Sequence, residues 1–217
     1  MKLVFFDFDG VVLDSVPIKT RAFGELFAEY GATIRQQAVD YHLAHGGISR
    51  FEKFRYYFRE LLHKPLSEGE LERLGLRFTE LTMSMLLAAP FISGIEATLA
   101  ELKTSGIPAV VASGTPQDDL DRILRERELG EYFVEAHGSP QTKVSIVEAV
   151  CSRYGVEPKE CVFVGDAMTD HDAARNFPMP FLGVSSPDVE FPEGTVVTTE
   201  ISAGALERAM DVFVVKQ

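Results

Sequence analysis

The sequence has only two cysteines, Cys151 and Cys161, and comparatively few basic side chains. Two cysteines are too few for a zinc framework, and we interpret them as reduced, small apolar residues of a cytoplasmic protein. Lys and Arg number 21 against 33 Asp and Glu, which gives a formal net charge of -12. Non-specific nucleic-acid binding depends on neutralising phosphates with basic side chains, so we expect no nucleic-acid partner.

Long hydrophobic runs are also lacking. The chain begins MKLVFF, but Asp7 and Asp9 interrupt this segment before the apolar stretch of a signal peptide can develop. No run approaches the roughly 20 apolar residues that cross a membrane, so we expect neither a secreted nor a membrane protein. The 217 residues suit one large domain, or a domain with a sizeable insertion, around a real hydrophobic core.

Short apolar runs, separated by helical segments, recur through most of the chain. Such runs predict a parallel sheet covered by helices on both faces, which is an α/β doubly wound, Rossmann-like core. One of the helices is expected to start at Ser139-Pro140. The predicted strands are Leu3–Phe8, Ala109–Ser113, Tyr132–Ala136, Cys161–Gly165, Pro180–Val184 and Val196–Thr199.

Residues 16–89 contain no convincing strand. Apolar residues recur there at helical spacing, which predicts several amphipathic helices. A crossover between parallel strands needs only a dozen or more residues, so this segment is far too long for one. We interpret residues 16–89 as a helical cap inserted after the first strand, over a core of residues 1–15 and 90–217. The cap has a net charge of +1 and the core one of -13.

Asp7 and Asp9 directly follow the apolar part of the first strand, and Gly10 comes next. Ligands bind at the carboxyl edge of open α/β sheets, and a glycine lets the backbone turn sharply there. One carboxylate of such a pair can attack as a nucleophile while the other handles protons. Considered alone, the pair is explained equally well as two aspartates in a turn that ends a strand.

Further carboxylates follow the fourth predicted strand, where Asp166 and Asp170 come after a glycine. If the first and fourth strands are neighbours, Asp166 meets Asp7 and Asp9 at one edge of the sheet. Three carboxylates that close repel one another strongly unless a cation lies between them. Oxygen ligands without nearby thiols favour Mg²⁺, and Asp170 can support these ligands from outside the inner set.

The residues around Asp170 also have an ordinary structural interpretation. Asp170 and Asp172 can cap the following helix, which accounts for Asp172 fully and for Asp170 in part. His171 is expected on the solvent-facing side of this helix rather than at a metal.

Two other segments contain groups that suit a phosphate. Ser113 and Gly114 follow the second strand, where a hydroxyl and the amides of a small-residue turn can cradle a phosphate, although Ser-Gly is also ordinary turn chemistry. Lys143 places a cation near the aspartates, although a lone lysine is by default exposed. The ordered set of Asp-x-Asp, Ser, Lys and Gly-Asp-x-x-x-Asp, each at a strand end or helix start, is highly specific.

This ordered set resembles the haloacid dehalogenase superfamily of aspartate-nucleophile phosphohydrolases, over the whole chain and with the helical cap included. The resemblance implies a Mg²⁺-dependent phosphatase for a small phosphorylated metabolite, either a sugar phosphate or a phosphorylated hydroxy acid. Asp7 is then the nucleophile that forms an aspartyl-phosphate, and Asp9 is the general acid/base. Ser113, Gly114 and Lys143 would hold the transferring phosphoryl group.

The same resemblance implies a metal site. Asp166 would bind Mg²⁺ together with Asp7 and the main-chain carbonyl of Asp9, and Asp170 matches the second acidic position of the last motif. The dehalogenases of this superfamily lack the second aspartate of the first motif, so Asp9 favours phosphate chemistry. Asp9 is expected to be held protonated, to donate to the leaving alkoxide and then to deprotonate the hydrolytic water.

Within the predicted cap, the segment from His45 to Arg50 has two glycines and a Ser-Arg pair at a helix start. It is similar to the cap loop of β-phosphoglucomutase-like members, in which an arginine contacts the far end of the substrate. We therefore expect Gly47, Ser49 and Arg50 to determine substrate specificity. The basic residues that follow are expected on a solvated helix face with ion pairs: Lys53, Arg55 and Arg59.

Other functions stay open at this point. A sugar-phosphate mutase would return the phosphoryl group to its substrate instead of passing it to water. A phospho-aspartate signalling receiver also has clustered aspartates on a parallel sheet, but receivers are small domains without a helical insertion. A catalytically silent binding protein is a third alternative, although no motif position is lost. No coiled-coil heptad indicates an obligate assembly, so a monomer or weak dimer is expected.

Overall fold

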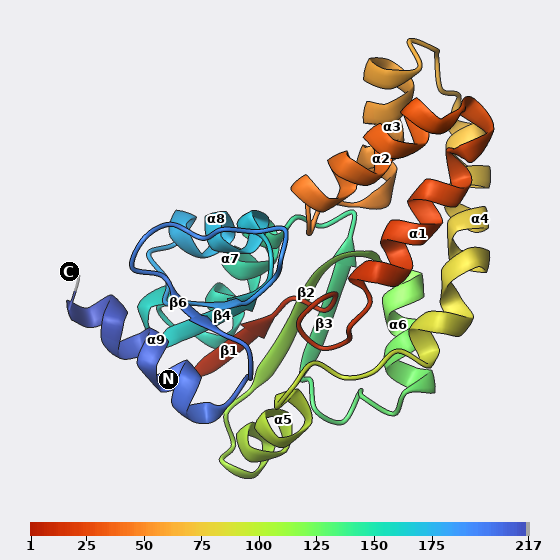
Figure 1. Ribbon diagram of the computed structural model, residues 1–217. Coiled ribbons are helices and arrows are strands. Elements are labelled where there is room, and N and C mark those ends of the chain that lie inside the picture. Colours follow the sequence, from red (N-terminus) through yellow and green to blue (C-terminus); the bar gives the residue numbers. More distant parts are fainter. Residues whose placement is uncertain (216–217) are drawn as a thin grey trace.

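The computed structural model describes residues 1–215, which form a parallel sheet with helices on both faces and a separate group of helices beside it (Figure 1). The six strands lie in the order β3-β2-β1-β4-β5-β6, and all of their pairings are parallel. Their bounds are β1 (Leu3–Phe6), β2 (Ala109–Pro116), β3 (Glu135–Ser139), β4 (Cys161–Gly165), β5 (Phe181–Val184) and β6 (Val196–Thr198).

Helices pack on the two faces of the sheet and over its carboxyl edge. The longer helices are α1 (Val16–Leu26), α2 (Ala32–Ala44), α3 (Arg50–Tyr56), α4 (Glu68–Leu87), α5 (Ile95–Thr104), α6 (Gln117–Glu126), α7 (Lys143–Tyr154), α8 (Met168–Asn176) and α9 (Ala203–Val215). Short helical turns are η1 (Ala28–Tyr30), a π-helical turn η2 (Tyr57–Leu61) that continues α3, and η3 (Pro158–Glu160).

The alternating side chains of β1 show why the core forms. Val4 and Phe6 pack in one apolar cluster with α5, α6 and α9, whereas Leu3 and Phe5 pack in another with α7 and α8. All four are fully buried, as expected for a strand covered on both faces. β1 lies between β2 and β4, where the strand order reverses, and ligands of such folds bind at this position. The predicted doubly wound fold with an inserted helical cap is confirmed.

Helices α1 to α4, for which we keep the term cap, have a hydrophobic core of their own. Aromatic rings dominate this cluster, and those of Phe23 and Phe78 lie 4.7 Å apart between centroids. Phe54, Tyr57 and Phe58 are buried in this cluster. The rings do not form an open stacking platform.

The two chain segments that connect the cap to the core lie side by side. Leu13 and Phe91 form an isolated antiparallel bridge, and the amide of Asp14 donates to the carbonyl of Pro90 at 2.9 Å. The chain therefore enters and leaves the cap at one place, beside the carboxyl end of β1.

The third strand differs from the sequence prediction. It was expected at Tyr132–Ala136 but runs from Glu135 to Ser139. Phe133 is buried because it packs against Phe6, with ring centroids 6.3 Å apart, and not because it belongs to a strand. β3 lies at the edge of the sheet, so it can include polar residues such as His137.

Two other boundaries were also predicted wrongly. Helix α7 begins at Lys143 and not at Ser139-Pro140, because Thr142 caps it by accepting a hydrogen bond from the amide of Ser145 at 3.2 Å. Strand β2 does not end at Ser113 but continues to Pro116, with a register shift against β3. The pairing becomes irregular where Ser113 lies.

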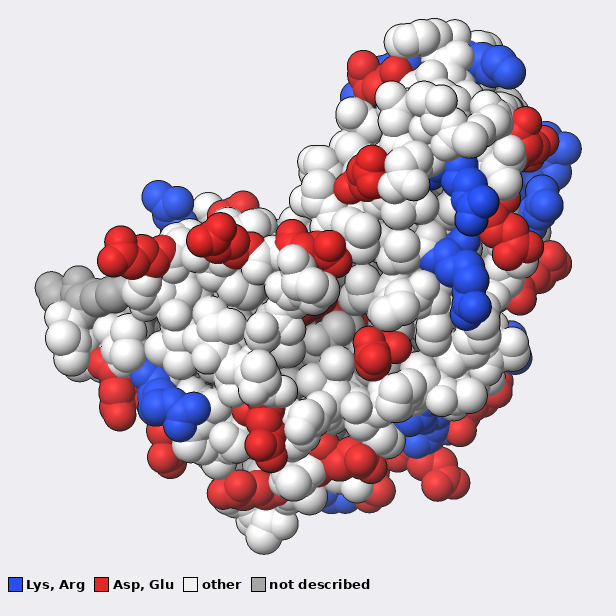
Figure 2. All heavy atoms as spheres, in the orientation of Figure 1, with Lys and Arg blue, Asp and Glu red and all other residues white. Residues whose placement is uncertain are grey.

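Charge is distributed unevenly over the surface. On the face shown in Figure 2, basic side chains gather mainly on the cap, whereas the core surface shows mostly acidic ones. Among the helices of residues 1–215, none has the length and apolar character that a membrane span requires.

Candidate active site

The carboxyl ends of β1 and β4 bring three aspartates together. Asp7 directly follows β1, and its amide donates to the carbonyl of Val164 in β4 at 2.9 Å. Asp166 follows β4, and Asp170 lies in the first turn of α8. Carboxylate oxygens of these three residues all lie within 4.8 Å of one another. The predicted meeting of Asp7 and Asp166 at one edge of the sheet is therefore observed.

Lys143, in the first turn of α7, reaches into this cluster. Its Nζ lies 2.8 Å from Asp7 Oδ2 and 2.5 Å from Asp170 Oδ1, and all three side chains are buried. Burial alone would lower the pKa of Lys143, but the charges of Asp170 and Asp7 outweigh it and raise the pKa, so the ammonium stays charged. Asp170 also accepts a hydrogen bond from the amide of Ala167 at 3.1 Å, so it caps α8 as well.

The cluster contains more negative than positive charge. Burial raises the pKa of Asp7, Asp166 and Asp170, and neighbouring carboxylates raise it further, although Lys143 opposes this. One ammonium cannot offset two buried carboxylates and a third that is half-buried. The cluster thus offers oxygen ligands with an excess of negative charge. Such a set fits Mg²⁺, which proteins usually bind through only a few carboxylates.

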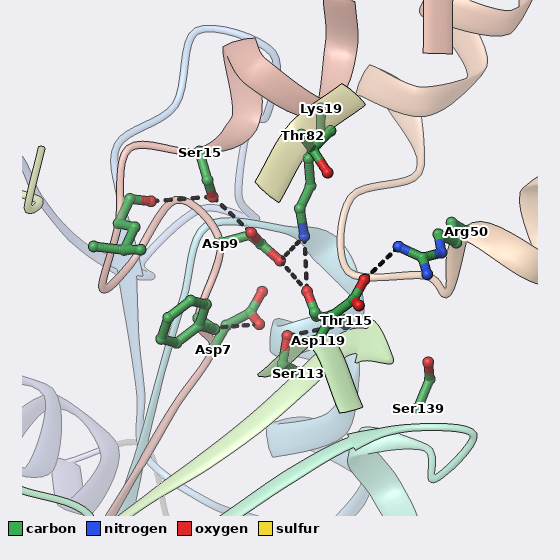
Figure 3. Close-up of polar contacts among 12 residues, drawn as sticks. Asp7, Asp9, Ser15, Lys19, Arg50, Thr82, Ser113, Thr115, Asp119 and Ser139 are labelled. Carbon is green, nitrogen blue, oxygen red and sulfur yellow. Dashed lines mark hydrogen bonds and ion pairs between the residues drawn. The ribbon is translucent and has the colours of Figure 1, made fainter. Parts of the chain in front are cut away.

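Asp9 is held by a different group of side chains (Figure 3). Its Oδ1 accepts from Ser15 Oγ at 2.6 Å, and its Oδ2 accepts from Lys19 Nζ at 2.5 Å and Thr115 Oγ1 at 2.7 Å. Burial would raise the pKa of Asp9, but Lys19 and these hydroxyls outweigh burial and lower it. The expectation that Asp9 is held protonated is wrong for this arrangement, because Lys19 stabilises the ionised form.

Sequence reasoning missed Ser15, Lys19 and Thr115. Ser15 precedes α1, and Lys19 follows one turn later, with its amide bonded to the carbonyl of Ser15 at 3.1 Å. This spacing of four residues places both side chains on the side of α1 that faces Asp9. The helical periodicity of the sequence could therefore have identified this pair. Thr115 joins them through the irregular end of β2, for which the sequence has no comparable signal.

The loop of residues 46–49, here called the cap loop, rests on the core. The carbonyl of Gly46 accepts a hydrogen bond from Thr169 Oγ1 at 2.9 Å, and Ser49 Oγ donates to Ser139 Oγ at 3.2 Å. Two cavities of about 70 and 250 Å³ lie beside this loop, and Gly47 and Gly114 line both. The cap and the core together enclose the site.

The smaller cavity includes Asp9 and Asp166, and the larger one includes Ser113 and Lys143. Ser113 is buried, and its Oγ accepts from the amide of Thr115 at 3.1 Å. The structure thus places Ser113, Gly114 and Lys143 around one cavity, and their binding of a phosphate stays a prediction.

Gly47 allows the cap loop to approach the core closely. Its φ is +75°, and a Cβ there would lie 2.1 Å from Thr169 Oγ1 and 2.7 Å from Lys143 Nζ. Only a residue without a side chain fits between the loop and these atoms.

We expect the substitution Gly47→Ala to displace the cap loop from the core. Amide hydrogen exchange at residues 46–49 should accelerate by at least about tenfold, because the added methyl group clashes with Thr169 and Lys143. Gly31→Ala is the matched control, since Gly31 also has a positive φ of 95° but no atom within 4 Å of its Cβ position. Equal exchange at residues 46–49 in both variants would contradict the steric explanation.

Arg50 connects the cap to the core. Its Nη1 lies 2.6 Å from Asp119 Oδ2 in α6 (Figure 3). Its Nη2 donates to Thr79 Oγ1 in α4 at 2.9 Å. The guanidinium therefore has partners in both the cap and the core, and Arg50 also lines the smaller cavity. A role of Arg50, Gly47 and Ser49 in specificity stays a prediction.

Three minor expectations are wrong. Lys53 is not on a solvated face but 2% exposed, because it packs inside the cap beside His42. His171 is partly buried against the rings of Phe181 and Phe191. Asp172 does not cap α8, because this helix begins at Met168 and Asp172 lies within it. The exposed ion pairs expected for the other two basic residues are present, as Arg55–Glu68 and Arg59–Glu60.

Known proteins share sequence and fold with this chain. Residues 1–177 match the family model of haloacid dehalogenase-like hydrolases. Phosphoglycolate phosphatase 1 of Pseudomonas aeruginosa is 29% identical over 185 residues, which cover 80% of this chain and 65% of that protein. A phosphorylated carbohydrates phosphatase of Thermotoga maritima is 25% identical over 183 residues, with 81% of each chain covered.

Among solved structures, a β-phosphoglucomutase from Clostridium difficile superposes with a TM-score of 0.79 over 99% of both chains. Because the two sequences are only 19% identical, this superposition shows a shared fold and no more. The present chain spans slightly less than two thirds of the Pseudomonas phosphatase. The family model, however, covers most of this chain, with the aspartates and the lysine inside the matched residues. The protein therefore belongs to the haloacid dehalogenase-like hydrolases.

Proposed function

We propose that the protein is a Mg²⁺-dependent phosphatase that hydrolyses a small phosphomonoester through an aspartyl-phosphate on Asp7. The position of Asp7 carries the proposal, since it lies at the end of the central strand with Lys143 Nζ 2.8 Å away. The amide of Phe8 also donates to Asp7 Oδ1 at 2.6 Å, which fixes the carboxylate. The names of the two phosphatase relatives point to a phosphorylated carbohydrate or hydroxy acid as the substrate.

In the first step, a carboxylate oxygen of Asp7 attacks phosphorus. The new bond from oxygen to phosphorus forms as the bond to the leaving oxygen breaks. Lys143 offsets part of the repulsion between the Asp7 carboxylate and the anionic ester. Ser113 and the backbone at Gly114 would hold the remaining phosphoryl oxygens from the neighbouring strand end.

Asp9 has two tasks that need opposite protonation states. The ionised form, which Lys19 stabilises, accepts a proton from the water that attacks the aspartyl-phosphate. The bond from the water oxygen to phosphorus forms as the bond from phosphorus to Asp7 breaks, which releases inorganic phosphate and restores the Asp7 carboxylate. Donation to the leaving alkoxide requires a protonated Asp9. That form becomes accessible when Lys19 and Thr115 release Oδ2, because burial alone raises the pKa of Asp9.

The carboxylates of Asp7 and Asp166 would hold Mg²⁺, with the main-chain carbonyl of Asp9 as a further ligand and with Asp170 supporting them from outside this inner set. Carboxylate oxygens of Asp7, Asp166 and Asp170 lie within 4.8 Å of one another, and their negative charge is only partly offset by Lys143. This arrangement fits a divalent cation. When bound, Mg²⁺ supplies positive charge against the repulsion between the nucleophile and the ester. A cytoplasmic location and a monomeric or weakly dimeric state also stay predictions.

Removal of divalent cations tests this proposal. Treatment with a chelator should lower the release of inorganic phosphate from an aryl phosphate by at least about 100-fold, and added Mg²⁺ should restore it. A panel of sugar phosphates and phosphorylated hydroxy acids, compared by kcat/KM, would then identify the substrate class. Phosphate release that chelation leaves unchanged would contradict the metal site. Isomerisation of a sugar phosphate without phosphate release would indicate a mutase.

A further inference from the structure

The smaller cavity beside the cap loop has cap residues in its wall that the proposed mechanism does not use. Asp9 and Asp166 line it from the core, and His42, Arg50 and Lys53 line it from the cap. With Lys19 of α1, the cap therefore places four nitrogen-bearing side chains next to the carboxylates of the reaction centre.

Two of the cations in this wall already have counter-charges. Arg50 forms its ion pair with Asp119, and Lys19 forms one with Asp9, at 2.6 and 2.5 Å. The positive charges of both are therefore largely offset by the protein itself.

Lys53 lacks such a counter-charge. It is 2% exposed, and its Nζ lies 2.8 Å from His42 Nδ1 and 3.3 Å from the carbonyl oxygen of His42. Among residues 1–215, no carboxylate lies within ion-pair distance of Nζ. Burial, and after it the charge of Lys19, lowers the pKa of Lys53 to about 7. Burial therefore disfavours the ammonium form of Lys53, and an anion close to Nζ would stabilise that form.

His42 supplies a second donor. Burial, followed by the charge of Lys53, lowers the pKa of His42 to about 2, so its ring is neutral. Because Nδ1 accepts from Lys53, the ring proton lies on Nε2. This Nε2 is buried and has no hydrogen-bond partner within the described part of the chain. Lys53 uses two of its three N–H groups on His42, so each residue retains one unused donor.

We propose that Lys53 and His42 form the binding site for a second anionic group of the substrate, on the cap side of the cavity. This inference rests on the proposed function, because the first anionic group is the phosphoryl group at Asp7. A bound anion would accept from both nitrogens and would supply the counter-charge that Lys53 lacks.

A purely structural role is the competing explanation. Lys53 Nζ also lies 5.5 Å from the ring centroid of Phe23, so the pair could simply stabilise the cap. A structural role affects folding and all ligands alike, whereas an anion site affects only ligands with a second anion. Discrimination between matched ligands therefore separates the two explanations.

The test uses three non-hydrolysable ligands that differ only at the far end of the molecule. They are propylphosphonate, 3-phosphonopropionate and propane-1,3-diphosphonate, titrated calorimetrically in the presence of Mg²⁺. The wild-type protein should bind an anionic-ended ligand at least about 30-fold more tightly than propylphosphonate, as expected for a buried charge-assisted contact. Whichever of the two anionic ligands binds more tightly identifies the second anionic group of the substrate as a carboxylate or a phosphate.

The substitution Lys53→Met should reduce this preference at least about tenfold, and His42→Phe should reduce it in the same direction. Arg55→Met is the matched control, because Arg55 lies on the same helix in an exposed ion pair with Glu68. Thermal unfolding of Lys53→Met and His42→Phe is measured alongside, so that a loss of folding is distinguished from a loss of the preference for an anionic ligand.

Equal affinity of the wild-type protein for all three ligands would overturn the proposal. A preference that survives in both Lys53→Met and His42→Phe would do the same. These binding constants do not depend on turnover. Failure of the phosphatase proposal would be recognised separately, by the absence of phosphate release from an aryl phosphate.

Discussion

The substitution Asp7→Asn is expected to lower kcat for phosphate release by at least about 10⁴-fold, because an amide cannot replace the attacking carboxylate. Asn has nearly the same shape as Asp, so the variant should fold. Phosphate release from an aryl phosphate with Mg²⁺, together with a circular-dichroism melting curve, measures both properties.

Asp14→Asn provides the control for Asp7→Asn. Asp14 is an exposed acid in the same loop, and its amide bonds to the carbonyl of Pro90, which the substitution leaves in place. Its activity should stay within about twofold of the wild type. Turnover above about 1% of the wild-type rate in a folded Asp7→Asn protein would place the nucleophile at another residue.

The substitution Lys143→Met should affect stability as well as activity. Its ammonium offsets Asp7 and Asp170 in a buried site, and removal of one partner from a buried ion pair typically costs about 3–5 kcal/mol. We expect the free energy of unfolding, measured in urea, to fall by about this amount. Phosphate release should fall by at least about 10³-fold, since neither Asp7 nor the phosphoryl group keeps its cation.

Lys159→Met is the comparison for this second variant. Lys159 is exposed and forms an ion pair with Glu157, and such surface pairs contribute only about 0–1 kcal/mol. A loss of stability in Lys143→Met no greater than that in Lys159→Met would mean that the buried carboxylates are compensated in some other way.

The main features of the site could be predicted because they depend on local sequence. Asp7 and Asp166 each follow a short run of buried apolar residues, and parallel strands deliver such ends to one edge. Lys143 could be placed near them for the same reason, although the start of its helix was misplaced by a few residues. The cap could be predicted because residues 16–89 contain no strand pattern and are too long for a simple crossover between parallel strands.

Features that depend on contacts between distant segments could not be predicted. The segment around Phe133 was predicted as a strand, because an apolar residue that packs beside a sheet looks the same in the sequence as one that lies within a strand. Lys53 looked like a surface cation, since its burial depends on how α2 and α3 pack around it. The pairing of Arg50 with Asp119 joins residues 69 positions apart, which no local pattern indicates.

The side-by-side connections of the cap have a consequence for motion. Since Leu13 and Phe91 are bridged and Asp14 is bonded to Pro90, the cap has a single attachment and can turn about one axis there. The contacts of the cap loop with Thr169 and Ser139 are the ones that such a turn would break. Entry of substrate and departure of product can proceed without disturbing either hydrophobic core.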